Sequence, residues 1–170
     1  GLAGWLLPWV AAVQQMSRAR PAAGTTLVLA MVRFDAEYTE RLRLFDGTEA
    51  VLRLARPEDA PLLQAGFAAL SPETRYLRFF AHKGALTDRE ARALTDLDGR
   101  EALALGAIGA PGTRTEGIPM GVARFSRAGP SVAEAAVVVV DAFQGRGLGL
   151  ELLRRLGAAA AERGFRTLCF

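Results

Sequence analysis

An apolar run that passes directly into a glycine-rich turn and then a long helical pattern is the strongest constraint on the fold. Residues 135–140 are small or β-branched and apolar, which is typical of a buried strand. Glycines follow at positions 145, 147 and 149, and helical spacing of apolar residues continues to about residue 163. Such a turn gathers free backbone N–H groups at the positive end of the helix dipole. The segment therefore predicts a phosphate-binding site, unless it is a tight turn that binds nothing.

Turn and capping signals divide the rest of the chain into a hairpin, three helices and further strands. Asp46-Gly47-Thr48 between two alternating runs predicts a β-hairpin. Helices are expected over residues 57–70, 71–80 and 88–98, and Thr87 with Glu90 forms a capping box for the third. Strands are expected over residues 101–110, 121–127, 132–140 and 166–170, the first three as an antiparallel meander with 132–140 central. The fold class predicted is α/β (α+β) with a mixed sheet.

Composition narrows the function classes. The 170 residues suit one domain, and 21 Lys and Arg against 18 Asp and Glu give a net charge of +3. The arginines are dispersed among acidic residues, whereas nucleic-acid binders gather basic and aromatic residues on one stripe. We therefore expect no nucleic-acid partner. Cys169 is the single cysteine, which excludes an internal disulfide framework and a cysteine-rich zinc site, and we expect it to be buried. His82 is the single histidine, and we expect it in a loop. We therefore expect no metal and a cytoplasmic location.

The N-terminal segment stands apart from the readable pattern. Its first 13 residues are almost wholly apolar but too few to span a bilayer, and no basic region precedes them as in a signal peptide. We assign residues 1–38 to an N-terminal extension, either a docked helix or sequence upstream of a start at Met31. The domain itself is expected over residues 39–170.

Two common phosphate-binding motifs do not fit the glycine cluster. A P-loop ends in Gly-Lys-Ser/Thr, and no lysine stands there. A dinucleotide fingerprint reads Gly-x-Gly-x-x-Gly and opens a parallel sheet, but here the third glycine comes one residue early and follows a predicted meander.

The segment Gln144-Gly145-Arg146-Gly147-Leu148-Gly149 resembles the Gln/Arg-x-x-Gly-x-Gly/Ala pyrophosphate loop of the GNAT N-acetyltransferases. The order of elements over residues 39–170 is also similar to that family, and residues 70–80 and 133–140 resemble bacterial protein lysine acetyltransferases. The resemblance implies an acetyl-CoA-dependent N-acetyltransferase that transfers acetyl directly to a primary amine, with a protein lysine as the expected acceptor. A small-molecule amine acetyltransferase and a non-catalytic acyl-CoA-binding regulatory module are the alternatives.

The resemblance also assigns roles to residues. Backbone N–H groups of the loop would hold the CoA pyrophosphate, with a direct charge from Arg146 (Gln144, Gly145, Arg146, Gly147, Leu148, Gly149). Val138, Val139 and Val140 would run beside the pantetheine arm. Glu134 is the candidate general base because a lysine ammonium must lose a proton before it attacks; a glutamate that merely faces water at a strand end is the alternative. In the family a helix and two strands follow the strand at residues 166–170, so the domain is expected to be partial and the general acid to lie beyond residue 170.

Overall fold

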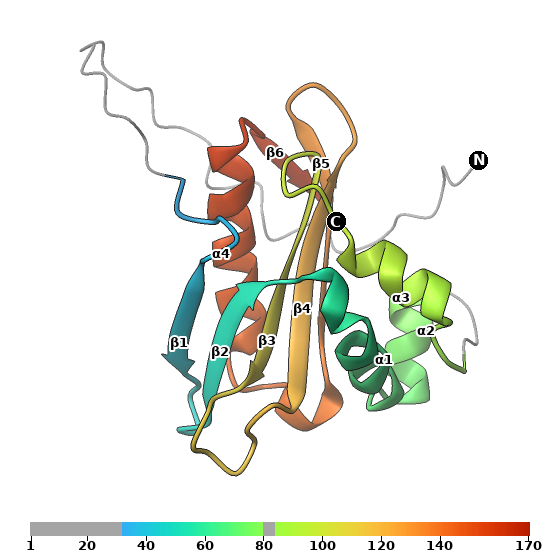
Figure 1. Ribbon diagram of the computed structural model, residues 1–170, viewed down its shortest axis with the longest axis vertical. Helices are drawn as coiled ribbons and strands as arrows, with labels where there is room; N and C mark the ends of the chain where they lie inside the picture. The colour runs from blue at the N-terminus through green and yellow to red at the C-terminus, as the bar shows by residue number, and fades with distance from the viewer. Residues whose placement is uncertain (1–31, 80–83) are drawn as a thin grey trace.

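The computed structural model describes residues 32–79 and 84–170, and it forms one sheet with helices on both faces (Figure 1). The N-terminal apolar segment and His82 lie outside the described residues. The sheet has six strands in chain order, antiparallel except for a parallel pair of β5 and β6. Their bounds are Thr39–Arg43 (β1), Glu49–Leu54 (β2), Ala102–Gly109 (β3), Pro119–Arg127 (β4), Val132–Val139 (β5) and Thr167–Cys169 (β6). The predicted hairpin, meander and mixed α/β sheet are confirmed.

In the described part of the chain, four α-helices and two short 3-10 helices connect the strands. The helices α1, α2 and α3 gather on one face of the sheet, and α4 covers the other (Figure 1). Their bounds are Pro57–Asp59 (η1), Ala60–Ala68 (α1), Pro72–Phe79 (α2), Asp88–Thr95 (α3), Asp141–Phe143 (η2) and Leu148–Glu162 (α4).

The end of α3 was predicted too late. The helix stops at Thr95 instead of near Asp98, because the Asp98 carboxylate organises a turn there. Its Oδ1 atom accepts the main-chain N–H groups of Arg100 (2.9 Å), Glu101 (2.9 Å) and Ala102 (3.1 Å). Side chains that bond neighbouring backbone groups in this way compete with helix formation.

The main core lies between α4 and the sheet. Leu148, Leu152 and Leu156 repeat along one stripe of α4 and are at most 1% exposed. They pack with residues from alternate positions of the strands, including Leu105 and Phe125, both fully buried. Each leucine buried in this way stabilises the fold by about 2 kcal/mol. The stripe fixes α4, and therefore the glycine-rich turn that precedes it, on the sheet.

Residues ahead of β1 belong to the same core. Phe34 is fully buried and Tyr38 is 8% exposed. The Glu162 carboxylate at the end of α4 accepts the N–H groups of Arg33 (3.1 Å) and Phe34 (3.2 Å), and Arg163 donates to the Phe34 carbonyl (2.7 Å). These contacts attach residues 33–38 to the domain, whereas the sequence pattern predicted that the domain begins at residue 39.

The outer strand β6 pairs with only the first part of β5. Their register joins Val132 to Thr167, Ala133 to Leu168 and Glu134 to Cys169. Beyond Glu134, β5 has no neighbour on that side among the described residues, so it is an interior strand over its first three residues only. Cys169 is exposed, and the prediction that it is buried was wrong, because among the described residues no strand covers its side of β6.

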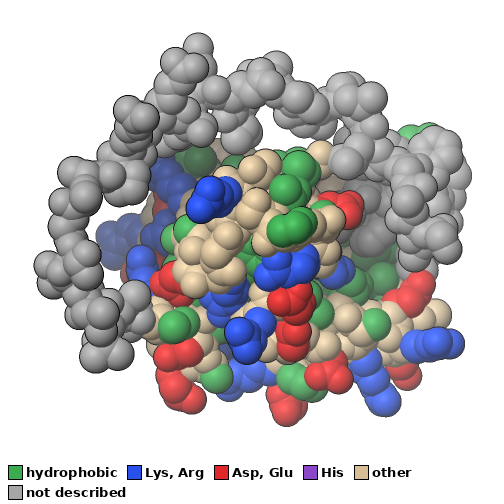
Figure 2. All heavy atoms as spheres, turned by 90° about the horizontal axis from the view of Figure 1, so that it is seen from above, with side chains coloured by type: hydrophobic (Ala, Val, Ile, Leu, Met, Phe, Trp, Pro, Cys, Tyr) green, Lys and Arg blue, Asp and Glu red, His purple; other side chains and the backbone are tan. Residues whose placement is uncertain are grey.

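The surface agrees with the composition. Figure 2 shows arginine and acidic side chains interspersed on the face it displays, without a continuous basic stripe. None of the described helices has the length and apolar content to cross a membrane.

Candidate functional site

The second half of β5 presents free main-chain groups at an open edge. The Val140 N–H donates to the Met120 carbonyl on β4 (2.8 Å). Because main-chain groups alternate in direction along an antiparallel strand, Val138 and Val140 bond toward β4, while Val137 and Val139 point toward the open edge. The Val139 carbonyl there accepts a hydrogen bond from Gln144 Nε2 (3.0 Å). The Val139 N–H and both main-chain groups of Val137 remain free of partners among the described residues.

This geometry sorts the three predicted valines. Val139 faces the open edge with its main chain, whereas the backbone of Val138 and Val140 is used by the sheet. The sequence-based prediction did not include Val137, although its main chain faces the open edge as that of Val139 does. The missing signal is the register of β4 and β5, which a single sequence of valines does not contain.

The predicted loop, residues 144–149, spans the turn between η2 and α4 and the first two residues of α4, and it has the form of an anion site. Gly145 and Gly147 have φ angles of +71° and +87°, a conformation that favours glycine. Within the described part of the chain, the N–H groups of residues 145–149 donate no hydrogen bond. Two of them, from Leu148 and Gly149, belong to the first turn of α4, whose dipole is positive at this end. Free N–H groups beside an open strand edge can bind a ligand that carries phosphate and amide groups.

Arg146 does not present a free charge in this structure. Its Nη1 atom donates to Asp46 Oδ2 (2.6 Å) and Thr48 Oγ1 (3.2 Å) at the tip of the β1–β2 hairpin. The guanidinium also lies 5.4 Å from the centre of the Phe143 ring, and the Arg146 carbonyl accepts the Phe45 N–H (3.1 Å). The hairpin tip therefore holds the loop from outside.

A second tie joins the same segment to α2. Asp141, the first residue of η2, accepts the Ser71 N–H at Oδ2 (2.8 Å) and the Thr74 hydroxyl at Oδ1 (2.9 Å). Burial acts to raise the pKa of Asp141, but these hydrogen bonds outweigh it and the pKa is lowered. The Ser71 hydroxyl caps α2 by accepting the Thr74 N–H (3.1 Å), and the Asp141 carboxylate holds both of these residues from a distant part of the chain.

Glu134 lies where the two last strands separate. It is the final β5 residue paired with β6, and it is exposed. Its neighbours Ala133 and Ala135 are buried toward α4 (0% and 6% exposed), so the Glu134 side chain is on the face of α1–α3. A base in this position is accessible to an acceptor and adjoins the start of the open edge.

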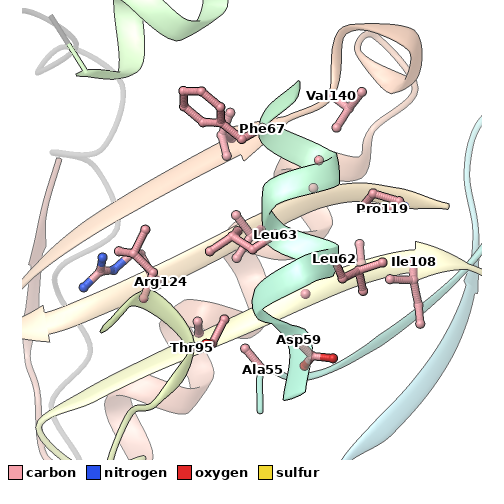
Figure 3. A pocket seen from close by; sticks show the side chains of 18 of the residues that line it. Ala55, Asp59, Leu62, Leu63, Phe67, Thr95, Ile108, Pro119, Arg124 and Val140 are labelled. Carbon is pink, nitrogen blue, oxygen red and sulfur yellow. The ribbon is translucent and has the colours of Figure 1, made fainter. Parts of the chain in front are cut away.

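A cavity of about 120 Å³ lies on the same face, between α1 and strands β3 to β5 (Figure 3). Leu62, Leu63 and Phe67 of α1 form one wall, and small residues such as Gly106 and Ala136 leave room at the sheet. Its walls are mainly apolar, and four of the described residues that line it have polar side chains (Arg53, Asp59, Thr95, Arg124). No sequence pattern singled out these four, because the cavity forms only when α1 and α3 pack on the sheet.

Comparisons with known proteins agree with this geometry. Residues 65–170 match the model of the acetyltransferase (GNAT) family. An acetyltransferase of Pseudomonas aeruginosa is 30% identical over 127 residues, which cover 74% of this chain and 67% of the relative. The GNAT domain of S. lividans PAT superposes with a TM-score of 0.70 and 31% identity over 78% of this chain and 77% of that one. A GNAT-type N-acetyltransferase from Kribbella flavida gives 0.54 and 28% over 71% and 70%.

Proposed function

Because this chain belongs to the acetyltransferase (GNAT) family, we propose that it binds acetyl-CoA and transfers the acetyl group directly to a primary amine. The observation that carries the proposal is the continuity of free main-chain groups from Val137 and Val139 at the strand edge to residues 145–149 at the start of α4. This arrangement suits a ligand with amides at one end and a pyrophosphate at the other.

The loop and the strand edge would hold the two parts of CoA separately. N–H groups at the α4 terminus would receive the pyrophosphate oxygens, since anions are stabilised at the positive end of a helix dipole. The Val139 N–H and the main chain of Val137 would pair with the pantetheine amides as an added strand would. The neutral amine would attack the thioester carbonyl, so that the C–N bond forms as the C–S bond breaks and CoA leaves as a thiolate that takes up a proton.

Glu134 has the task of preparing the amine. An amine attacks a thioester only when neutral, so an ammonium group must first give a proton to a base, directly or through water. Glu134 is exposed at the point where β5 and β6 separate, which places its carboxylate beside the open strand edge. We therefore propose Glu134 as the general base.

A protein lysine is the proposed acceptor. This is supported by the resemblance of residues 70–80 and 133–140 to bacterial protein lysine acetyltransferases, and by the similarity to the GNAT domain of S. lividans PAT. A small amine would enter the same site, and the cavity under α1 favours this second candidate because it would enclose a compact acceptor.

The test separates binding from transfer. Acetyl-CoA affinity is measured by calorimetry, and acetylation of a lysine peptide and of a small amine by mass spectrometry, for the wild type, Glu134→Gln and Glu37→Gln. Glu37 is also exposed but lies before β1, so its variant is the matched control. Glu134→Gln should keep the wild-type affinity and lose about a hundredfold or more in transfer rate.

Each other outcome has a distinct meaning. Wild-type transfer by Glu134→Gln would show that Glu134 is not the base. Binding of acetyl-CoA by the wild type without acetylation of any amine would support a non-catalytic acyl-CoA-binding module instead.

A further inference from the structure

The cavity under α1 contains two arginines in opposite situations. Arg53 forms a two-pronged ion pair with Asp59, with Nη1–Oδ2 and Nη2–Oδ1 distances both of 2.7 Å. Arg124 has no hydrogen bond, and no acidic oxygen within 4.0 Å, among the described residues. Of the two cations that the described residues place on the cavity wall, Arg124 is therefore the one available to a ligand.

The other polar groups among the described lining residues do not pair with the Arg124 guanidinium. The Asp59 carboxylate is occupied by Arg53 and by the Arg56 N–H (2.8 Å). The Thr95 hydroxyl bonds to the Ala91 carbonyl of its own helix (2.9 Å). The other described residues of the lining are apolar, such as Leu63 and Val138.

Arg124 lies beside the proposed base. The register of β4 and β5 places Arg124 opposite Ala136 and Ser126 opposite Glu134, so Arg124 and Glu134 are diagonal neighbours on one face. In Figure 3 the guanidinium is at the end of the cavity remote from Pro119 and Val140. The cavity thus runs from an apolar interior to an end that carries one cation next to Glu134.

A cation in this position is costly without a partner. Burial lowers the pKa of Arg124, and the nearby charge of Glu134 offsets only part of that effect. A guanidinium nevertheless stays charged at neutral pH, and a partly buried charge is destabilising unless it is paired. A carboxylate matches its planar fork and accepts two parallel hydrogen bonds from it.

We propose that Arg124 is a specificity-determining residue that binds a carboxylate of the amine acceptor, close to the amine that Glu134 deprotonates. This inference rests on the proposed function. The apolar part of the acceptor would enter the cavity under α1. Acceptors without a carboxylate would bring their ammonium toward the Arg124 guanidinium, which would repel it, and would be disfavoured.

The carboxylate that Arg124 binds can come from two sources, an acidic residue next to a target lysine or the α-carboxylate of a free amino acid. The experiment therefore uses two matched pairs. One pair is a lysine peptide with an adjacent Glu and the same peptide with Gln; the other is leucine and leucinamide. For each pair the ratio of kcat/KM between the carboxylate and the amide is measured.

The ratio is compared in the wild type, Arg124→Gln, Arg124→Lys and Arg100→Gln. Arg100 is an exposed arginine in the turn before β3, so its variant makes the same charge change away from the cavity. The wild type and Arg100→Gln should prefer the carboxylate by about tenfold to a hundredfold in one pair, which identifies its source. Arg124→Gln should reduce that ratio to about one, and Arg124→Lys should leave an intermediate ratio because it keeps the charge without the fork.

The failures are distinguishable. Equal use of carboxylate and amide acceptors by the wild type, or a preference that survives in a folded Arg124→Gln, would overturn the inference but leave the acetyltransferase intact. Acetylation of no acceptor by a wild type that binds acetyl-CoA would overturn the proposed function, and the inference with it. Thermal unfolding shows that each variant is folded, and the Lys variant still decides if the Gln variant is not.

Discussion

A glutamate at position 149 would test the phosphate site with little disturbance of the fold. A Cβ atom on Gly149 would meet only Val139 Cγ2, at 3.6 Å, an ordinary contact at the end of the open strand edge. Gly147 is a poorer choice, because its φ is +87° and its Cβ would lie 2.8 Å from the Phe45 ring. Loss of binding in Gly147→Glu would therefore report strain as well as charge.

The size of the effect follows from charge repulsion. A carboxylate about 5 Å from a doubly charged pyrophosphate is repelled by about 1.7 kcal/mol with the full screening of water, and by more at a lower effective dielectric. The affinity for acetyl-CoA should fall by more than about tenfold. Stability should not fall, because replacing glycine in a helix gains about 0.5 kcal/mol and an acid in the first turn gains about as much again.

The assay is calorimetric titration of acetyl-CoA into the wild type, Gly149→Glu and Gly157→Glu, with thermal unfolding of each. Gly157 lies in the middle of α4, and a Cβ there would meet nothing within 4 Å. Its variant repeats the substitution on the same helix, away from the loop. Equal affinity in the two variants would refute the assignment of the pyrophosphate to residues 145–149, and a lower unfolding temperature for Gly149→Glu would refute the packing argument.

Two further predictions concern stability. Glu40 accepts hydrogen bonds from Arg155 (2.6 Å) and Tyr38 (2.6 Å), and chiefly the Arg155 bond lowers its pKa from 4.5 to about 2. The contribution of Glu40 to the free energy of unfolding is therefore complete above pH 4.5 and is lost as the pH falls toward 2. In urea unfolding, Glu40→Gln should lower that free energy by about 2 kcal/mol at pH 7 and by much less near pH 2. A difference between wild type and variant that does not depend on pH would contradict this. Asp141→Asn leaves one acceptor oxygen for Ser71 and Thr74, so it should destabilise the fold by about 1 kcal/mol and speed hydrogen exchange in α2. Unchanged exchange there would show that these two hydrogen bonds are dispensable.

Much of the fold could be predicted because its signals are local. The Thr87 and Glu90 capping box forms as expected, with the Thr87 N–H donating to the Glu90 carboxylate (2.9 Å). Gly47 adopts a φ of +85° in the hairpin turn, and Gly164 ends α4 with a φ of +82°. Each of these features depends on residues within a few positions, so one sequence contains the whole of the signal.

The candidate site could be predicted only in part. The glycine-rich turn and the apolar strand before it are set by composition and spacing, and the structure arranges their free N–H groups side by side. Which valines turn their main chain to the open edge depends on the register between β4 and β5. In this register the main chain of Val138 bonds to β4 and that of Val137 faces the open edge, and a shift by one residue would reverse the two. The register is set by pairing with a strand elsewhere in the chain.

The sequence by itself determined the strand, the glycine turn and the helix, because each is specified by period and by backbone freedom within a few residues. Tertiary structure alone decided which charges remain available. Arg146 is paired with Asp46, 100 residues away, whereas Arg124 faces a cavity in which Asp59 is occupied by Arg53. A charge is free or paired according to what the fold brings within about 4 Å of it, and that distance has no counterpart in sequence spacing.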